Sequence, residues 1–365
     1  MAEIVDRNLQ VNKNVDETGA RFYSVREDPF DVYGLYNYRT EKTFKRLPDE
    51  LSDLSWGIKN LYRNTAGARV RFSTDSDYII IRAKMSQISK MPHMPLISSA
   101  GFDLYTDCKE SGISWFTDIF RPDIDMTDGY ESKIFVRGKG IRYYTINFPS
   151  YSSVDDLEIG LKEGSFVGGG LKYRDILPVL YYGCSVTQGA CSSRPGNAYQ
   201  NIVSRRTNTD FINLGFSGWA RGETELAKYM STIKMSAFVS DYDHNAPDVE
   251  HLKNTHKNMY EIIREKNPDV PYIIMSKPDF FRLVGEDIGT NAERRDVIYE
   301  TYRYALKNGD KNVYFLDGSS MFISGEEDMC TVDNAHPNDY GFYLMANAVE
   351  GTLHRIWVNK SISGK

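Results

Sequence analysis

The sequence has few cysteines, no long apolar run and no excess of basic residues. Its four cysteines lack CxxC spacing, so neither a disulfide framework nor a zinc ribbon is expected. No apolar stretch approaches the roughly 20 residues of a membrane-spanning helix, and the start of the chain lacks the apolar centre of a signal peptide. The formal net charge of −6 disfavours nucleic acid and anionic membranes as partners, because phosphate binding needs a basic face. These absences favour a cytoplasmic protein.

Length and periodicity divide the chain into two predicted domains. A total of 365 residues exceeds what one core of ordinary size organises. In residues 1–174, short runs alternate apolar and polar residues, as at Val70–Phe72, Ile141–Phe148 and Leu157–Leu161. Short alternating strands at this spacing predict an all-β sandwich of jelly-roll type. We interpret Gly168–Gly170 as a turn or flexible joint near the boundary, because no helical pattern follows it as a phosphate-binding loop requires.

Residues 175–365 have a different pattern, in which short apolar runs alternate with helical periodicity. The predicted strands are Leu177–Tyr182, Phe211–Leu214, Met235–Val239, Tyr272–Met275 and Val313–Leu316. The predicted helical faces lie around Leu252–Ile263, around Val297–Leu306 with a stop at Asn308–Gly309, and from about 339 to 357. This alternation predicts a parallel sheet with helices on both faces, a three-layer α/β/α domain of flavodoxin-like type. Ligands of such sheets bind beyond the carboxyl ends of the strands.

Ser185 lies at one of these predicted strand ends. It belongs to Tyr181-Tyr-Gly-Cys-Ser-Val-Thr-Gln-Gly189, which predicts a strand followed by a tight turn that presents the serine. A serine hydroxyl is a weak nucleophile that needs a base, and the base needs an orienting partner. Of the six histidines, only His336 lies in a loop before a helix with an aspartate, Asp333, three positions upstream. We expect Asp333 to accept from Nδ1 and to leave Nε2 for Ser185.

Two alternatives to this relay stay open at the level of sequence. The Asp333–Pro337 segment also fits a helix N-terminus with incidental polar residues, and His244, beside Asp243, is a rival base.

Two further strand ends offer hydrogen-bond donors for an oxyanion. Gly215 follows a predicted strand and leads toward a helix, so its amide can point into the crevice at the strand ends. Asn245 lies just past another strand, and its side-chain amide can donate as well. Each residue also fits an ordinary turn.

Four segments in this order resemble the four sequence blocks of the SGNH (GDSL-type) hydrolase superfamily. They are Gly183-Cys-Ser-Val-Thr-Gln-Gly189, Asn213-Leu-Gly215, Asn245 and Asp333-Asn-Ala-His-Pro337. The resemblance implies that Ser185 is the nucleophile, that His336 is general base and then general acid, and that Asp333 orients it. It also implies an oxyanion hole formed by the amides of Ser185 and Gly215 and the side chain of Asn245.

The chain departs from the family pattern in two places. Cys184 stands where aspartate is usual, and Asp243-His-Asn-Ala246 stands where Gly-x-Asn-Asp is usual. Neither departure removes a catalytic group.

The N-terminal half carries a second resemblance. Ala100-Gly-Phe-Asp-Leu-Tyr105 is similar to a Gly-x-Asp-Leu-Tyr signature found ahead of some SGNH catalytic domains, and Asn64–Phe72 is similar to a strand entry of the same module. Two-domain SGNH enzymes with such a β module are often carbohydrate esterases that remove acetyl groups. The resemblance therefore implies a serine esterase that hydrolyses short acyl esters, above all acetyl esters of carbohydrates, through an acyl-enzyme on Ser185.

An acyltransferase on the same scaffold and a carbohydrate-binding protein with an inactive hydrolase domain are the alternative functions. We expect a small-molecule or oligosaccharide ester as partner, no metal or organic cofactor, no nucleic acid and no membrane, while a homo-oligomer stays open. Trp219 is a candidate sugar platform or acyl wall, with plain packing as an equal alternative, and Trp115 is expected in a core or a domain interface. Cys184 is expected to be a small buried residue. His251 and His256 are five positions apart on a predicted helix, so they do not form a zinc pair.

Overall fold

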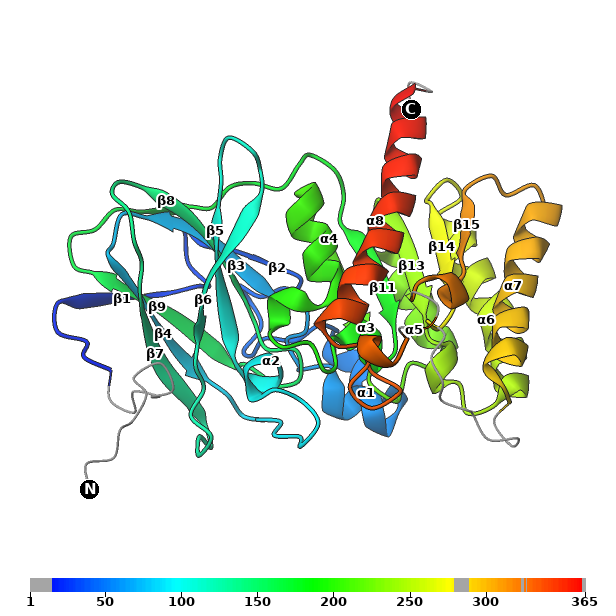
Figure 1. Cartoon of the computed structure of the whole chain (residues 1–365), viewed down its shortest axis with the longest axis horizontal. Coiled ribbons are helices and arrows are strands. Elements are labelled where there is room, and N and C mark those ends of the chain that lie inside the picture. The colour runs from blue at the N-terminus through cyan, green and yellow to red at the C-terminus, as the bar shows by residue number, and fades with distance from the viewer. Residues whose placement is uncertain (1–14, 279–288, 323–324, 326, 363–365) are drawn as a thin grey trace.

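The computed structural model describes residues 15–278, 289–322, 325 and 327–362. Figure 1 shows a β-rich part, formed by the first half of the chain, beside a part in which helices flank a sheet. The strands of the first part are β1 (Ala20–Ser24), β2 (Asp31–Tyr33), β3 (Arg69–Thr74), β4 (Tyr78–Lys84), β5 (Phe102–Asp107), β6 (Ser114–Phe120), β7 (Gly129–Phe135), β8 (Arg142–Asn147), β9 (Asp156–Lys162) and β10 (Val167–Gly169). Its helical segments are η2 (Asp49–Leu54), α1 (Trp56–Leu61) and α2 (Leu96–Ala100).

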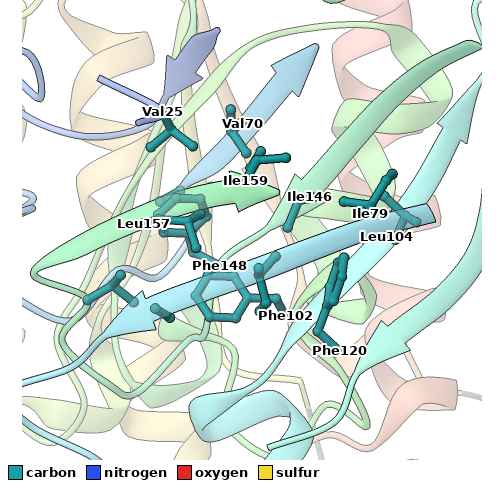
Figure 2. Close-up of a cluster of buried hydrophobic side chains, with 14 of the residues drawn as sticks. Val25, Val70, Ile79, Phe102, Leu104, Phe120, Ile146, Phe148, Leu157 and Ile159 are labelled. Atoms are coloured by element: carbon teal, nitrogen blue, oxygen red, sulfur yellow. The ribbon is translucent and has the colours of Figure 1, made fainter. Parts of the chain in front are cut away.

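These strands form two antiparallel sheets that face each other. One sheet has the order β1-β9-β4-β7, and the other has the order β10-β3-β8-β5-β6 with β2 paired to β3. Figure 2 shows their side chains in one buried core, with Ile79 and Leu157 from the first sheet and Val70, Phe102 and Ile146 from the second. Because successive residues of a strand point to opposite faces, the alternating sequence places one apolar face of each sheet inward. The predicted β-sandwich is confirmed.

The second part is built on one five-stranded sheet. Its strands are β11 (Val179–Gly183), β12 (Phe211–Gly215), β13 (Ala237–Asp241), β14 (Tyr272–Met275) and β15 (Val313–Leu316). They are all parallel, in the order β12-β11-β13-β14-β15. The helices are α3 (Ser185–Gln188), α4 (Tyr199–Thr207), α5 (Thr224–Thr232), α6 (Val249–Lys266), α7 (Asn291–Lys307) and α8 (Asp339–Ile362), with short η3 (Pro195–Asn197), η4 (Asp243–Asn245), η6 (Gly318–Ser320) and η7 (Glu327–Cys330) turns.

Helices cover both faces of this sheet and create two separate cores. Side chains of α5, α6 and α7 pack with Leu180 and Tyr182 of β11 on one face. Side chains of α4 and α8 pack with Val179 and Tyr181 of the same strand on the other face. The continuous apolar run of β11 is therefore buried on both sides, as in parallel sheets generally. The predicted three-layer α/β/α architecture is confirmed.

Element ends were predicted unequally well. The bounds of β14 and β15 match the prediction, whereas β13 begins and ends two residues later than predicted. The predicted stop of α7 is confirmed, because Asn308 is its C-cap residue and Gly309 follows with a φ of +83°.

Buried polar side chains join the two halves. The Arg69 guanidinium on β3 bonds to the Asp210 carboxylate and donates to the carbonyl oxygen of Phe211 at 3.1 Å, at the start of β12. Asp103, the aspartate of the Gly-x-Asp-Leu-Tyr segment, accepts from the Gly196 amide and from Asn147 Nδ2, each at 2.8 Å. The Gly-x-Asp-Leu-Tyr segment therefore contacts the second half of the chain shortly after α3, at Gly196 in η3.

Two predictions for the first half are wrong. Gly168–Gly170 is not a free joint, because Val167–Gly169 forms β10 and pairs with β3. A Cβ on Gly168 would lie 2.8 Å from the Ser73 hydroxyl, so glycine permits this close approach. Trp115 is 64% exposed rather than buried, because it lies on β6, which is an edge strand paired with β5 among the described residues.

Within the described ranges, no helix combines the length and the apolar character that a membrane crossing requires.

Candidate active site

Ser185 lies at the carboxyl edge of the parallel sheet, two residues after the end of β11. The strand ends at Gly183, and α3 begins at Ser185 with Cys184 as its N-cap residue. Gly183 is needed here, because a Cβ would lie 2.1 Å from the carbonyl oxygen of Asp241 on β13. Ser185 is only 8% exposed, and its backbone amide has no hydrogen bond to the described residues. The hydroxyl and a free amide are therefore presented at one point.

His336 and Asp333 lie together on the loop between η7 and α8. Backbone pairing closes the base of this loop, since Thr331 forms a bridge with Pro337 and the Val332 amide donates to the His336 carbonyl oxygen at 2.9 Å. Asp333 Oδ1 accepts the amide of His336 at 2.8 Å. The other carboxylate oxygen, Oδ2, accepts from His336 Nδ1 at 2.8 Å. One carboxylate thus fixes the loop and orients the imidazole.

The environment of Asp333 favours its charged form. Burial alone would raise the pKa of this carboxyl, but hydrogen bonds from the His336 ring and from the amides of His336 and Ala335 outweigh it. The net result is a pKa below the usual value of 3.8. The lowered pKa favours Asp333 as a carboxylate, an acceptor that holds a ring proton of His336 on Nδ1.

His336 Nε2 lies 3.0 Å from the Ser185 hydroxyl oxygen. With the ring proton held on Nδ1, Nε2 offers its lone pair, and the serine hydroxyl donates to it. The structure therefore brings together Ser185, His336 and Asp333, which sequence analysis selected from segments about 150 positions apart. This chain of hydrogen bonds can remove the serine proton as oxygen attacks a carbonyl carbon.

The rival base does not contact the serine. His244 lies in η4, with its Nε2 3.9 Å from Asp243 Oδ1. The histidine that contacts Ser185 is His336.

The expectation for Gly215 is wrong. Its amide donates to the side-chain oxygen of Asn213 at 2.8 Å, so it does not point into the crevice. Asn213 in turn donates from Nδ2 to the Thr187 carbonyl oxygen at 2.7 Å. A Cβ on Gly215 would lie 2.3 Å from the Gln188 amide nitrogen, so this glycine is needed for close packing of β12 against α3. Gly215 therefore permits close packing between β12 and α3, the helix that begins at Ser185.

Gly218, three residues further along the same loop, was not singled out from the sequence. It has a φ of +75°, and nothing lies within 4 Å of the position that its Cβ would occupy. Its amide has no hydrogen bond to the described residues. The preceding residue, Ser217, donates its amide to Gln188 Oε1 at 2.9 Å, which ties this loop to α3. A glycine after serine in a strand-to-helix loop is a turn signal that could have identified this position.

Asn245 is held so that its amide group is available. It ends η4, and its Oδ1 accepts from the Ala220 amide at 3.4 Å, in the loop after β12. The side-chain nitrogen has no hydrogen bond to the described residues and remains a donor. Asn245 therefore lies beyond β13 with its Oδ1 facing the loop after β12, and its role as an oxyanion donor stays a prediction.

Trp219 belongs to an aromatic pair that spans the two halves. Its ring centroid lies 5.6 Å from that of Trp56 at the start of α1, and Gly57 leaves room for it. The Arg221 guanidinium lies 4.2 Å from the Trp219 ring centroid. Trp56 is 69% exposed, so part of this pair faces solvent next to the Gly218 loop.

Cys184 is fully buried, as expected, and burial raises the pKa of its thiol well above the usual value. Behind it, Thr187 donates to Asp241 Oδ2 at 3.1 Å. Burial, followed by repulsion from Asp243, raises the pKa of Asp241. The residue before Ser185 is therefore a buried thiol, and the Asp241 carboxyl on the neighbouring strand β13 bonds to Thr187 of α3.

The two histidines of α6 have separate partners. His251 Nε2 lies 2.7 Å from the carbonyl oxygen of Arg221, and His256 Nδ1 lies 2.8 Å from the Thr301 hydroxyl. Each imidazole is thus engaged with a different neighbour.

Comparisons with known proteins cover both halves of the chain. Residues 177–354 match the model of the GDSL-like lipase/acylhydrolase family, and residues 20–167 match the model of the N-terminus of SGNH-hydrolase-type esterases. No curated protein matches the sequence.

Several solved structures share the whole arrangement. A protein of Bacteroides ovatus ATCC 8483 that is named as a GDSL-like lipase is 25% identical, with a TM-score of 0.82 over 93% of this chain and 98% of that one. A salicylyl-acyltransferase from a tetracycline biosynthetic pathway is 19% identical, with a TM-score of 0.75 over 93% and 98%. A family two carbohydrate esterase from Cellvibrio japonicus is 12% identical, with a TM-score of 0.59 over 92% and 98%. The similarities to the acyltransferase and to the carbohydrate esterase, at 19% and 12% identity, show a shared fold.

Proposed function

Because the chain belongs to the SGNH (GDSL-type) hydrolase superfamily, we propose that it is a serine esterase for short acyl esters, with acetylated carbohydrates as its substrate class. The observation that carries the proposal is the hydrogen-bonded chain from Asp333 through His336 to Ser185, with distances of 2.8 and 3.0 Å. Those lengths are within hydrogen-bond reach for proton transfer.

Each residue of the chain has one role in the proposed reaction. Ser185 attacks the ester carbonyl while His336 Nε2 takes its proton, and the Asp333 carboxylate stabilises the imidazolium that forms. The imidazolium then protonates the leaving alcohol, which leaves an acyl group on Ser185. Water attacks this acyl-enzyme with His336 again as base, and the acid is released.

Three donors serve the oxyanion in this proposal. They are the backbone amides of Ser185 and Gly218 and the Nδ2 group of Asn245, all three free of hydrogen bonds to the described residues. Gly218 replaces Gly215, whose amide is bonded to Asn213. Such donors stabilise the tetrahedral intermediate more than the ground state, which is what accelerates the reaction.

The proposed sugar site is the exposed side of the Trp56–Trp219 pair. Sugar rings pack on aromatic faces, and this pair adjoins the Gly218 loop. A carbohydrate esterase of the same fold supports the substrate class by analogy only.

The decisive experiment is active-site labelling with a fluorophosphonate, followed by peptide mapping. We expect labelling of Ser185 in the parent chain and none in Ser185→Ala. Hydrolysis of nitrophenyl acetate should fall by about 10⁴-fold in Ser185→Ala and in His336→Ala. His354→Ala, which changes an exposed histidine on α8, is the matched control and should retain full activity. Near-parental hydrolysis by Ser185→Ala would reject the proposal.

A screen of acetylated xylo- and manno-oligosaccharides beside nitrophenyl esters of rising chain length would test the substrate class. An acyltransferase of this fold exists, and transfer uses the same acyl-enzyme. Product analysis with an added acceptor alcohol separates the two outcomes, since an esterase releases free acid whereas a transferase forms a new ester.

A further inference from the structure

Three side chains from distant segments converge beside Ser185. They are His93 from the loop between β4 and α2, Cys191 just after α3, and His336. One potential ligand atom from each lies within 4.8 Å of those of the other two. The rings of His93 and His336 are 5.8 Å apart at an interplanar angle of 39°. No sequence spacing joins these residues, because the first comes from the β-sandwich half.

The backbone holds Cys191 in this position. Its φ of +67° is unusual for a residue with a side chain, and its thiol donates to the carbonyl oxygen of His93 at 3.5 Å. Met94 and Tyr151 pack with Cys191 in a small apolar cluster under the loop. The buried thiol is therefore fixed beneath the exposed imidazole of His93.

We propose that His93, Cys191 and His336 form a binding site for a zinc ion, and that occupation of this site inhibits the enzyme. Two imidazoles and one thiolate are a ligand set that selects Zn²⁺ over Mg²⁺ or Ca²⁺. Tetrahedral zinc places such ligand atoms about 3.5 Å apart, so the three side chains need to close by about 1 Å. A water molecule completes the four ligands. On binding, the Zn–S bond replaces the S–H bond of Cys191, and the proton passes to solvent.

Inhibition follows from the role proposed for His336, and this part of the inference rests on the proposed function. If zinc binds Nε2, it occupies the lone pair that takes the serine proton. If it binds Nδ1, it displaces the Asp333 carboxylate and releases the ring from its orientation. Either mode leaves Ser185 without a working base.

A second cluster, formed by Cys184, Asp241 and His244, has similar dimensions but a different setting. Cys184 and Asp241 are at most 1% exposed, so an ion would have no open ligand position. His93, in contrast, is exposed and offers a path for the ion.

The test measures zinc binding and activity separately. Titration calorimetry with ZnCl₂ should show one site in the parent chain, and in Ser185→Ala as well, because the serine is not a ligand. His93→Ala, and independently His93→Gln and Cys191→Ser, should weaken binding at least tenfold. Cys108→Ser and His244→Ala are matched controls that should bind as the parent does. With Co²⁺ as probe, a thiolate-to-metal absorption band should appear in the parent and disappear in Cys191→Ser.

In the nitrophenyl acetate assay, zinc should inhibit the parent and a chelator should restore activity. His93→Ala should need at least tenfold more zinc for the same inhibition. Parental zinc affinity in both His93→Ala and Cys191→Ser would overturn the site, as would loss of binding in His244→Ala alone. A chain that binds zinc through these residues but hydrolyses no ester would retain the site and reject the proposed function instead.

Discussion

Arg46 Nη1 donates to the carbonyl oxygen of Gly215 at 2.7 Å, so a cation from the N-terminal half holds the end of β12. Its other nitrogens donate to the carbonyl oxygens of Asn64 at 2.7 Å and Leu61 at 2.8 Å. The side chain is buried, and burial lowers its pKa to about 9. The Arg46 guanidinium thus links the carbonyl oxygens of Leu61 and Asn64 to the end of β12. The loop that carries Gly218 follows directly after this strand.

Replacement of Arg46 by methionine should destabilise the protein and weaken the site together. The substitution removes hydrogen bonds to four carbonyl oxygens, those of Leu61, Asn64, Asn213 and Gly215, and the expected loss is about 2–4 kcal/mol of unfolding free energy. Arg46→Lys keeps the charge and at least one bond, so its loss should be smaller. Urea unfolding measures both variants, and equal stability of Arg46→Met and parent would show that the contacts contribute little.

Asp333→Asn should retain the loop but disrupt the relay. The amide oxygen can still accept from the backbone, whereas the amide nitrogen cannot accept from His336 Nδ1. The ring then favours the tautomer with its proton on Nε2, which cannot take the serine proton. We expect kcat to fall by about 10³–10⁴-fold with little change in KM. Steady-state kinetics on nitrophenyl acetate provides the measurement, and a fall of less than tenfold would contradict the orienting role.

Asn245→Ala should affect turnover rather than substrate binding. It removes one oxyanion donor, for which the typical cost is about 2.7–4 kcal/mol, or 10²–10³-fold in kcat. Asn254→Ala changes an exposed asparagine of α6 and is the matched control. A rise in KM without a change in kcat would assign Asn245 to ground-state binding.

His256 should make the fold sensitive to acid. Burial lowers its pKa from 6.5 to about 3, so below pH 6.5 the unfolded chain takes up a proton that the folded chain refuses. Stability is therefore lost as the pH falls from 6.5 toward 3, by about 2 kcal/mol between pH 7 and pH 5. In His256→Gln the change in unfolding free energy between these pH values should shrink by that amount. An unchanged pH dependence in the variant would mean that His256 is protonated in the folded state.

The sequence predicted what local pattern determines. The apolar run of β11 followed by a glycine predicted the position of Ser185, and Asp333 with His336 could be paired because they share one loop. The amide of Gly215 was predicted wrongly, because its direction depends on the side chain of Asn213.

Contacts between segments that lie far apart in the sequence could not be predicted from it. Arg69 on β3 appears as one of the charged residues of an alternating strand, yet it is 1% exposed because its partner Asp210 arrives from the other half. His93 had no pattern that linked it to His336, since only the folded chain makes their loops meet.

The backbone bridge between Thr331 and Pro337 has a mechanical consequence. His336 and Asp333 lie on the same hairpin. A displacement of this hairpin would therefore preserve the bond between Nδ1 and the carboxylate and would change the distance from Nε2 to the Ser185 hydroxyl. A movement of about 1 Å would lengthen a single contact beyond proton-transfer range and arrest turnover without unfolding anything. The distance between His336 Nε2 and the Ser185 hydroxyl is thus a quantity that temperature, pressure or a bound molecule can change.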